Sequence, residues 1–183
     1  ELPIFRDPHC GPASAGQTNE KRMPIVISAN ADLALHVVEF TGRVRFSELT
    51  ALAQTHAANR AWAGSDTVHV VADDADLSLL TDDDLDVLRA RYRKLHQSID
   101  FFMLRRSGWA CATSKACRIV EHWLRDRHSR DGQGTEVYLA SALDGLSELF
   151  SAEELQAVAA RTGFVEQWKI DRTHAPDEDV HHG

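Results

Sequence analysis

The sequence has no apolar run of membrane-spanning length, few cysteines and no excess of positive charge. Its longest apolar runs, at residues 25–27 and 101–104, fall far short of the about 20 residues that a spanning helix needs. The net charge of −8 and the pI near 5.6 provide no basic face for contacts with phosphates. We therefore expect neither membrane insertion nor binding to nucleic acid.

The three cysteines, Cys10, Cys111 and Cys117, are an odd number and form no CxxC pair. This spacing argues against a disulfide framework and against a zinc site. Cys111 follows an apolar run and Cys117 lies in an expected helix, so both are interpreted as small core residues with poorly reactive thiols. Residues 1–22 show no charged-then-apolar signal pattern, and a cytoplasmic location is expected.

Motifs that carry catalysis or bind cofactors are also missing. There is no GxGxxG or Walker loop, and Gly108, Gly132 and Gly134 are interpreted as turn residues. His122 and His128 are six residues apart, unlike the i, i+4 pair of metalloproteases. Residues 73–76 offer carboxylates for Ca²⁺ but lack the glycine and distal glutamate of an EF-hand. We expect no catalytic residues, no metal, no cofactor and a non-enzymatic role.

The stretch 65–88 is the most informative part of the sequence. Val68, Val70 and Val71 form a β-branched run typical of a strand, and an acidic loop follows it. Thr81 with Asp84 three residues later forms a capping box, which predicts the start of a helix. A strand followed by a capped helix favours an α/β sheet.

The residues before this stretch predict an extended arm, a hairpin and a helix. The arm covers residues 1–22, which are rich in proline and polar residues. A strand at 24–30 and a second strand that begins at Leu33 and is ended by Thr41 and Gly42 are separated by a turn and should pair as an antiparallel hairpin. Ser47 is a possible helix start, and Gly64 is well placed to end that helix after Ala63.

The helix from Asp82 carries an apolar stripe of Leu85, Leu88, Tyr92 and Leu95, with Arg89, Arg91, Arg93 and Lys94 expected on its opposite face. Residues 98–106 either continue this helix or form a connecting apolar segment. Later strands are expected at 67–72, 109–113 and 136–139, and later helices at 114–127, at 141–150 and, capped by Ser151 with Glu154, from 151 to near Gly163. Residues 128–134 are expected to form a loop, and residues 173–183 a polar tail.

Strands alternate with helices after the opening hairpin. This order predicts an α/β domain with a mixed, mostly parallel sheet of about five strands, an N-terminal β-hairpin and helices packed against the sheet. The domain is expected at residues 23–150, between the arm at 1–22 and a C-terminal helix and polar tail at 151–183.

The order of elements, with the segments TGRVRFSELTALA, DTVHVVADDADLSLLTDDDLDVL and GTEVYLASALDGLSELF, resembles the STAS-like superfamily (sulfate transporter and anti-sigma factor antagonist). The resemblance is closest to small bacterial stand-alone members of unknown function. In the antagonists of that family, a serine at the start of the helix after the central strand is phosphorylated by a partner kinase. The matching positions here are Thr81, Asp82, Asp83 and Asp84.

The acidic turn at residues 81–84 has two interpretations. Asp residues at a first helical turn stabilise free backbone N–H groups and the positive end of the helix dipole. Alternatively, their fixed negative charge imitates a phosphorylated state and the turn binds a regulatory protein. Either interpretation argues against a switch based on serine phosphorylation at this turn, although Thr81 is a possible phosphoacceptor.

A second candidate site lies where another expected helix begins after a strand. Thr113, Ser114 and Lys115 offer two hydroxyls, an ammonium group and free N–H groups, which could hold an anion. Beside them, Trp109 could bound an apolar cleft together with Phe101, Phe102 and Met103. The sequence thus leaves two functions open: binding of a regulatory protein, or carriage of a small apolar or anionic ligand, as in lipid-binding members of the fold.

Overall fold

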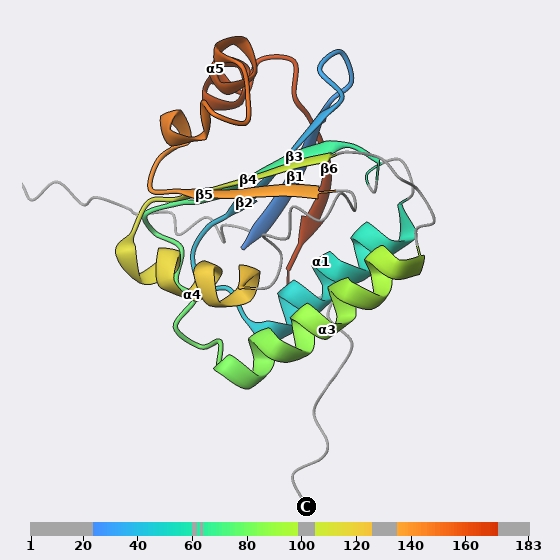
Figure 1. Ribbon diagram of the computed structural model, residues 1–183, viewed down its shortest axis with the longest axis vertical. Coiled ribbons are helices and arrows are strands. Elements are labelled where there is room, and N and C mark those ends of the chain that lie inside the picture. Colours follow the sequence, from blue (N-terminus) through green and yellow to red (C-terminus); the bar gives the residue numbers. More distant parts are fainter. Residues whose placement is uncertain (1–23, 60–61, 63, 99–104, 126–134, 172–183) are drawn as a thin grey trace, which may run out of the picture.

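The computed structural model describes residues 24–59, 62, 64–98, 105–125 and 135–171. These residues form one six-stranded sheet with helices on both faces (Figure 1). The elements, in chain order, are β1 (Ile25–Asn30), β2 (Leu35–Phe40), α1 (Phe46–Ala58), β3 (Asp66–Val71), α3 (Asp82–Ser98), β4 (Arg105–Cys111), α4 (Ser114–Leu124), β5 (Thr135–Ala140), the 3₁₀-helix η1 (Leu143–Leu146), α5 (Ala152–Ala160) and β6 (Val165–Ile170).

The sheet has the strand order β5-β4-β3-β2-β1-β6. Strands β2 to β5 pair in parallel, whereas β1 pairs antiparallel with both β2 and β6. The predicted α/β class, the N-terminal hairpin and the mostly parallel sheet are confirmed. The expected number of about five strands is wrong, because β6 extends the sheet beyond residue 150.

Strand β6 was not predicted, because its sequence shows no clear pattern of apolar residues. Four of its six residues are exposed, and only Ile170 at its end is fully buried. An edge strand with one protected side does not need the alternating apolar pattern that identifies the inner strands. Strand β6 nevertheless contributes to the sheet, because it pairs with the outer edge of β1.

The chain builds β2 to β5 by moving in one direction across the sheet. Right-handed crossovers in one direction place every connecting helix on the same face, and α1, α3 and α4 lie together below the sheet in Figure 1. The chain then returns over the opposite face through η1 and α5 to reach β6 at the far edge. We call these two sides the helical face and the α5 face.

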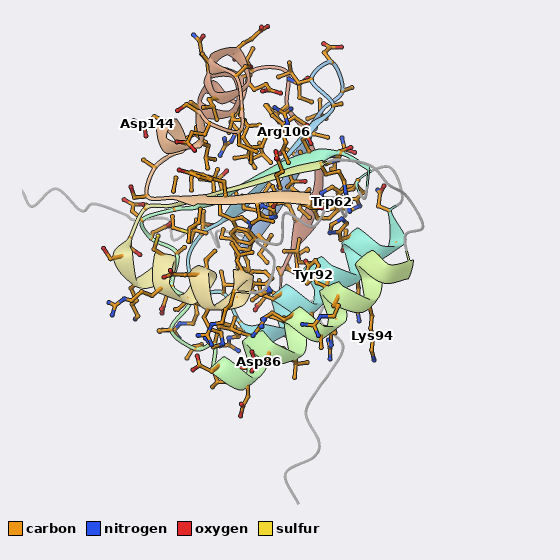
Figure 2. The ribbon with its side chains drawn as sticks, viewed as in Figure 1. Trp62, Asp86, Tyr92, Lys94, Arg106 and Asp144 are labelled. Carbon is orange, nitrogen blue, oxygen red and sulfur yellow. The ribbon has the colours of Figure 1, made fainter. Side chains whose placement is uncertain are left out.

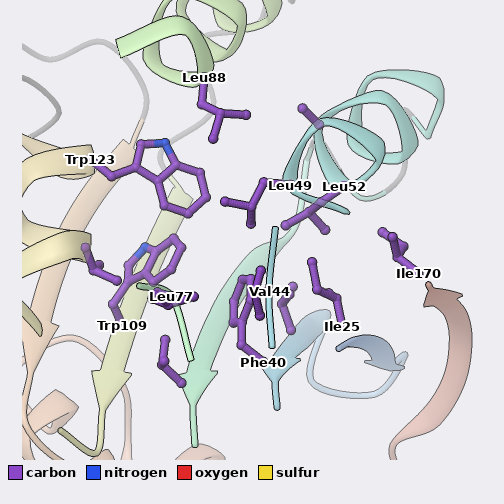
Figure 3. Close-up of a cluster of buried hydrophobic side chains, with 14 of the residues drawn as sticks. Ile25, Phe40, Val44, Leu49, Leu52, Leu77, Leu88, Trp109, Trp123 and Ile170 are labelled. Carbon is purple, nitrogen blue, oxygen red and sulfur yellow. The ribbon is translucent and has the colours of Figure 1, made fainter. Parts of the chain in front are cut away.

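The helical face holds the larger core. Alternate residues of the strands point toward it, such as Val38 and Phe40 of β2 and Trp109 of β4 (Figure 3). Helices α1, α3 and α4 cover it with Leu49, Leu88, Trp123 and their neighbours. All four tryptophans of the chain belong to this cluster or pack against it.

The α5 face holds a smaller cluster around Leu146 and Phe150. Gly108 of β4 lies beneath these two side chains, and a Cβ at this position would come within 2.7 Å of Phe150 and 2.9 Å of Leu146. The interpretation of Gly108 as a turn residue is therefore wrong. It is a strand residue whose missing side chain lets η1 and the segment after it approach the sheet closely.

Several predicted helix ends differ from the structure. Helix α1 begins at Phe46, one residue before Ser47, and Glu48 accepts a hydrogen bond from the Arg45 backbone N–H at 2.8 Å. It ends at Ala58 with Asn59 as its C-cap, well before Gly64. Residues 141–150, expected as a helix, form only the short 3₁₀-helix η1 and turns. The helix predicted from Ser151 is confirmed, with its capping box to Glu154.

Helix α3 extends to Ser98 and β4 begins at Arg105, so only part of the ambiguous segment 98–106 is assigned; residues 99–104 and the predicted loop 128–134 lie outside the described residues. Leu85, Leu88 and Tyr92 of the predicted stripe are buried.

The predicted arginine-rich opposite face of α3 is only half right. Arg93 and Lys94 are exposed, and Figure 2 shows Lys94 pointing outward from the helix. Arg91 instead lies between helices, where its guanidinium donates to Thr50 Oγ1 at 3.0 Å and stacks 5.4 Å from the Phe46 ring centroid. The prediction for Arg89 and Arg91 rested on helical spacing alone. Both are half-buried in the structure, because long side chains can reach around the helix into an interface.

Candidate functional site

The acidic turn at residues 81–84 starts α3, and its capping box is present in the structure. Asp84 Oδ2 accepts from the Thr81 backbone N–H at 2.9 Å, and Thr81 Oγ1 accepts from the Asp84 N–H at 3.1 Å. The Thr81 hydroxyl also donates to Asp84 Oδ2 at 2.7 Å. Thr81, Asp82 and Asp83 are exposed, while Asp84 is half-buried. The turn is thus both a helix cap and a solvent-facing acidic surface.

Exposed apolar side chains lie on both sides of this turn. Leu79 precedes Thr81 by two residues and is 49% exposed. Val87 follows Asp83 by one helical turn and is 45% exposed. Leu80, next to Leu79, instead packs against the core together with Leu85, so the segment enters the helix in a fixed orientation.

A network of charged side chains joins the first turns of α3 to α4. His122 Nδ1 lies 3.0 Å from Arg125 Nη2. Its Nε2 lies 3.4 Å from Asp86 Oδ1, which also accepts from Arg89 Nη1 at 2.6 Å. Asp82 lies farther away, with its Oδ1 3.9 Å from His122 Nδ1. Because Arg125 can only donate, Nδ1 is the acceptor in neutral His122, and the ring proton is on Nε2 facing Asp86.

The network acts on the pKa of the Asp86 carboxyl group in two opposite directions. Desolvation acts to raise its pKa, but the hydrogen bonds and charges of Arg89 and His122 together outweigh that effect. The pKa of Asp86 therefore lies below its usual value, and the group stays ionised in the network. Figure 2 places Asp86 near the start of α3, at the opposite end of the helix from Lys94.

An open groove of about 510 Å³ lies beside this network. Five of its six lining residues come from α4 and the residue after it, and the sixth begins α3: Arg118, Ile119, Glu121, His122, Arg125 and Asp82. Two guanidinium groups and two carboxylates line it, which gives nearly balanced charge at neutral pH. Among the residues that the structure describes, no hydroxyl or thiol hydrogen-bonds to the His122 ring.

Sequence reasoning missed this network. His122 was compared only with His128, which lies outside the described residues, whereas its contacts are on α3, 36 and 40 residues earlier in the chain. The apolar side chains of α4, Val120 and Trp123 among them, are buried. On a helical projection of α4, His122 lies at the margin of these buried residues. This position is the only sequence signal that α4 contacts α3 through His122.

The second predicted site is only partly assembled. Helix α4 begins at Ser114, and its N-cap is Thr113, whose Oγ1 accepts from the Ala116 N–H at 3.2 Å. Ser114 and Lys115 are exposed. Trp109 is 2% exposed and stacks on His69 with a centroid distance of 3.9 Å. The structure therefore does not bring Trp109 together with Thr113, Ser114 and Lys115 as a binding surface.

The predicted apolar cleft has no wall at Trp109, because that side chain is packed into the core. Phe101, Phe102 and Met103 lie outside the described residues. The acidic loop at 73–76 is occupied by local contacts instead: Asp76 accepts from the Ser78 N–H at 3.0 Å and faces Arg43 at 3.8 Å. In the described part of the chain, no group of three or more metal-ligating side chains is assembled.

A second charged cluster lies on the α5 face (Figure 2). Arg106 donates from Nε and Nη2 to Asp66 Oδ2 at 2.8 and 2.6 Å, and from Nη2 and Nη1 to Glu154 at 2.7 and 3.1 Å. Its guanidinium carbon lies 4.7 Å from the centroid of the Phe150 ring. These contacts raise the pKa of Arg106 and lower that of Glu154, for which the hydrogen bond from Arg106 is the main cause. The cluster ties α5 to the sheet.

Comparisons with known proteins identify no relative of this chain. No family model, no curated protein and no solved structure matches it. None of the helices that the structure describes is both long and apolar enough to span a membrane.

Proposed function

We propose that this protein is a non-enzymatic, STAS-like regulatory module that works in the cytoplasm by binding a protein partner through the start of α3. The observation that carries the proposal is the pair of exposed apolar side chains beside the acidic turn. The described residues include only three large exposed hydrophobic side chains, and Leu79 and Val87 are two of them. The third, Val165, begins the edge strand β6.

Protein-binding surfaces combine an apolar centre with a polar or charged rim. Leu79 and Val87 supply apolar area, and the carboxylates of Asp82 and Asp83 supply negative charge next to it. A partner that fits this surface carries apolar side chains flanked by lysine or arginine. The charged groups contribute mostly to the rate and selectivity of association, and the apolar groups to its strength.

The acidic turn also favours a surface that does not depend on phosphorylation. The Thr81 hydroxyl both donates to and accepts from Asp84, so phosphorylation would break two hydrogen bonds of the cap. Asp82 and Asp83 already provide negative charge where the antagonists of the STAS family acquire it. We therefore propose that this surface binds its protein partner without prior phosphorylation.

A photo-crosslinking experiment tests the proposal. A benzophenone amino acid is introduced at position 87 of the full chain or, as the matched control, at position 165, which is also an exposed valine. In cells of the source organism, irradiation should give a discrete protein adduct from position 87 and none of the same mass from position 165. Asp83→Asn should reduce the yield of that adduct.

Equal adducts from both positions, or no adduct from position 87, would contradict the proposed surface. Native mass spectrometry of the freshly purified protein provides an independent check. A stoichiometric co-purified small molecule would favour the ligand-carrier function instead. Stoichiometric phosphate on Thr81 would disprove the claim that the surface is not switched by phosphorylation.

A further inference from the structure

His122 is the residue through which the last turn of α4 contacts the first turns of α3. Its side chain is 17% exposed, and its Nε2 lies 3.4 Å from Asp86 Oδ1. Its Nδ1 has two charged neighbours: Arg125 Nη2 lies at 3.0 Å and Asp82 Oδ1 at 3.9 Å. A guanidinium group and a carboxylate therefore compete for the same ring nitrogen.

In neutral His122 this competition favours Arg125. A guanidinium group can only donate, so Nδ1 is the acceptor and the ring proton is on Nε2. The ionised Asp82 carboxylate can only accept, and the unprotonated Nδ1 has nothing to donate to it. The Asp82 side chain is 83% exposed, so its carboxylate remains part of the solvent-facing acidic turn.

Protonation of His122 reverses the preference. The added proton goes to Nδ1, which then faces the Arg125 donor with a like charge and a donor of its own. Asp82 becomes the acceptor that the ring requires. A charge-assisted N–H···O hydrogen bond is about 2.7–2.9 Å long, so Asp82 Oδ1 needs to move by only about 1 Å. Histidine side chains change their charge in the range between about pH 5 and pH 8.

The groove leaves room for this exchange and offers Arg125 a new partner. Asp82, His122 and Arg125 all line the open groove of about 510 Å³, so no core side chain has to move. Glu121 also lines the groove, but it lies about 100° around α4 from His122. It precedes Arg125 by four residues, which is the i, i+4 order in which a carboxylate and a guanidinium group pair favourably.

The other charged groups confine the exchange to Nδ1. Asp86 Oδ1 faces Nε2 and is held by Arg89 Nη1 at 2.6 Å, so a proton on Nε2 has its partner in both states. Arg118 lines the same groove, but its Nε donates to the Ser114 carbonyl at 3.4 Å. A positive charge on His122 is also favourable in the last turn of α4, at the negative end of the helix dipole.

We propose that protonation of His122 exchanges Arg125 for Asp82 at Nδ1 and thereby withdraws the Asp82 carboxylate from the proposed protein-binding surface at the start of α3. The acidic turn then presents one free carboxylate fewer to a basic partner, and binding weakens as the pH falls. The effect on binding rests on the proposed protein-binding function, whereas the exchange itself is a property of the free chain.

NMR spectroscopy of the free full chain tests the exchange without a partner. Long-range ¹H–¹⁵N spectra report which ring nitrogens carry protons, and the signal that is missing from His122→Gln belongs to His122. At pH 8 the ring should be protonated on Nε2 alone, with nuclear Overhauser contacts from Hε1 to the Arg125 side chain. At pH 5.5 both nitrogens should be protonated, and contacts to the Asp82 β-protons should replace those to Arg125.

Two neighbouring aspartates provide matched variants for the same titration. Asp82→Asn removes the charge of the incoming acceptor, so the midpoint of the His122 titration should move to lower pH by about 0.5 or more. Asp83→Asn removes the same charge about 100° farther around α3 and should leave the midpoint in place. Equal shifts in the two variants, or contacts from the ring to Arg125 at both pH values, would overturn the exchange.

The cross-link from position 87 tests the effect on binding. In lysates of the source organism, the yield of the adduct found in cells should fall about threefold between pH 7.5 and pH 5.5. His122→Gln, whose amide can accept from Arg125 but cannot take up a proton, should give the same yield at both pH values. Asp82→Asn should behave likewise, and it decides the matter if His122→Gln does not fold.

The two measurements separate the possible failures. A parent yield that does not change with pH, although NMR shows the exchange, would disprove the regulatory role of His122. No adduct at either pH would overturn the protein-binding function and the regulatory role with it. The NMR result would in that case still support or overturn the exchange at Nδ1.

Discussion

The two faces of the sheet are stabilised in different ways. The helical face buries a wide aromatic and aliphatic cluster under three helices. The α5 face carries a smaller apolar cluster, covered by a four-residue 3₁₀-helix and a nine-residue α-helix. There, the half-buried Arg106 links β3, β4 and α5 through two carboxylates.

This difference follows from the amount of surface that each set of elements can cover. Long helices bury enough apolar area to hold themselves on a sheet without directional bonds. Short elements bury less, so a directed contact decides where they lie. The fork of the Arg106 guanidinium fixes α5 more specifically than the few apolar side chains of that helix can.

Truncation of the aromatic core should have the largest effect. Trp109→Ala removes a fully buried side chain that contacts Phe40, His69 and Trp123. We expect the free energy of unfolding to fall by about 3–5 kcal/mol, from lost burial and the cavity left behind. Urea titration measures the change, and Val165→Ala at the exposed edge should change it by less than about 0.5 kcal/mol. A loss below about 1 kcal/mol would show that the helical face does not depend on its aromatic packing.

Removal of the charged link on the α5 face should cost less. Arg106→Gln leaves the carboxylates of Asp66 and Glu154 without their shared donor, and we expect a loss of about 2–3 kcal/mol at neutral pH. Arg106→Lys keeps the charge but loses the fork, so it should fall between the parent and Arg106→Gln. Urea titrations of the three proteins provide the ranking. Equal stability of all three would mean that apolar contacts alone hold α5.

The same link predicts how stability changes in acid. Arg106 lowers the pKa of Glu154 below its ordinary value of 4.5, so the folded state binds a proton on Glu154 less readily than the unfolded chain does. The contribution of Glu154 is therefore present above about pH 4.5 and is lost as the pH falls through the lowered pKa. The gap in stability between the parent and Arg106→Gln should accordingly narrow below pH 4.5.

The helical face should respond to acid at a higher pH. His36 stacks on Trp62 at a centroid distance of 5.7 Å, and burial lowers the pKa of its ring below 6.5. The unfolded chain therefore takes up the proton first, so stability should fall as the pH decreases from about 6.5 toward the folded pKa. In His36→Phe, which keeps an aromatic ring, the plot of stability against pH between 7.5 and 5.5 should be flatter than in the parent. Parallel plots would show that His36 protonates freely in the folded protein.

The contrast between the faces also explains how much the sequence could predict. The inner strands and the capped helices were found because β-branched runs and capping boxes are local patterns, as in Val68–Val71 and Thr81–Asp84. Strand β6, the role of Gly108 and the link from Arg106 to Glu154 were not found. Each depends on a segment that is distant in the sequence. A polar edge strand or a single arginine has no hydrophobic periodicity from which its partner could be predicted.

The candidate sites divide in the same way. The capping of α3 by Thr81 follows from spacing and was predicted, whereas the contact of His122 with Asp86 needs the packing angle of two helices. The position of Trp109 was misjudged because a tryptophan beside a strand end can face either a cleft or the core. Here the strand alternation turns it toward the helical face.

The smallest expected effect is at the cap of α3, where the helical face meets solvent. Thr81→Ala removes the acceptor for the Asp84 N–H and the hydroxyl donor to Asp84 Oδ2. Replacement of an N-cap threonine typically costs about 0.5–2 kcal/mol, and the exposure of Thr81 places this one near the lower end.

Asp83→Asn is the matched control at the same turn, because Asp83 is exposed and keeps its shape while losing its charge. It removes only a screened interaction with the helix dipole, of roughly 0.3–1 kcal/mol, and should therefore cost less than Thr81→Ala. If both variants are as stable as the parent in denaturant titration, the turn does not stabilise α3 as a cap. Weaker cross-linking from position 87 in Asp83→Asn, with an unchanged unfolding curve, would instead assign its charge to binding.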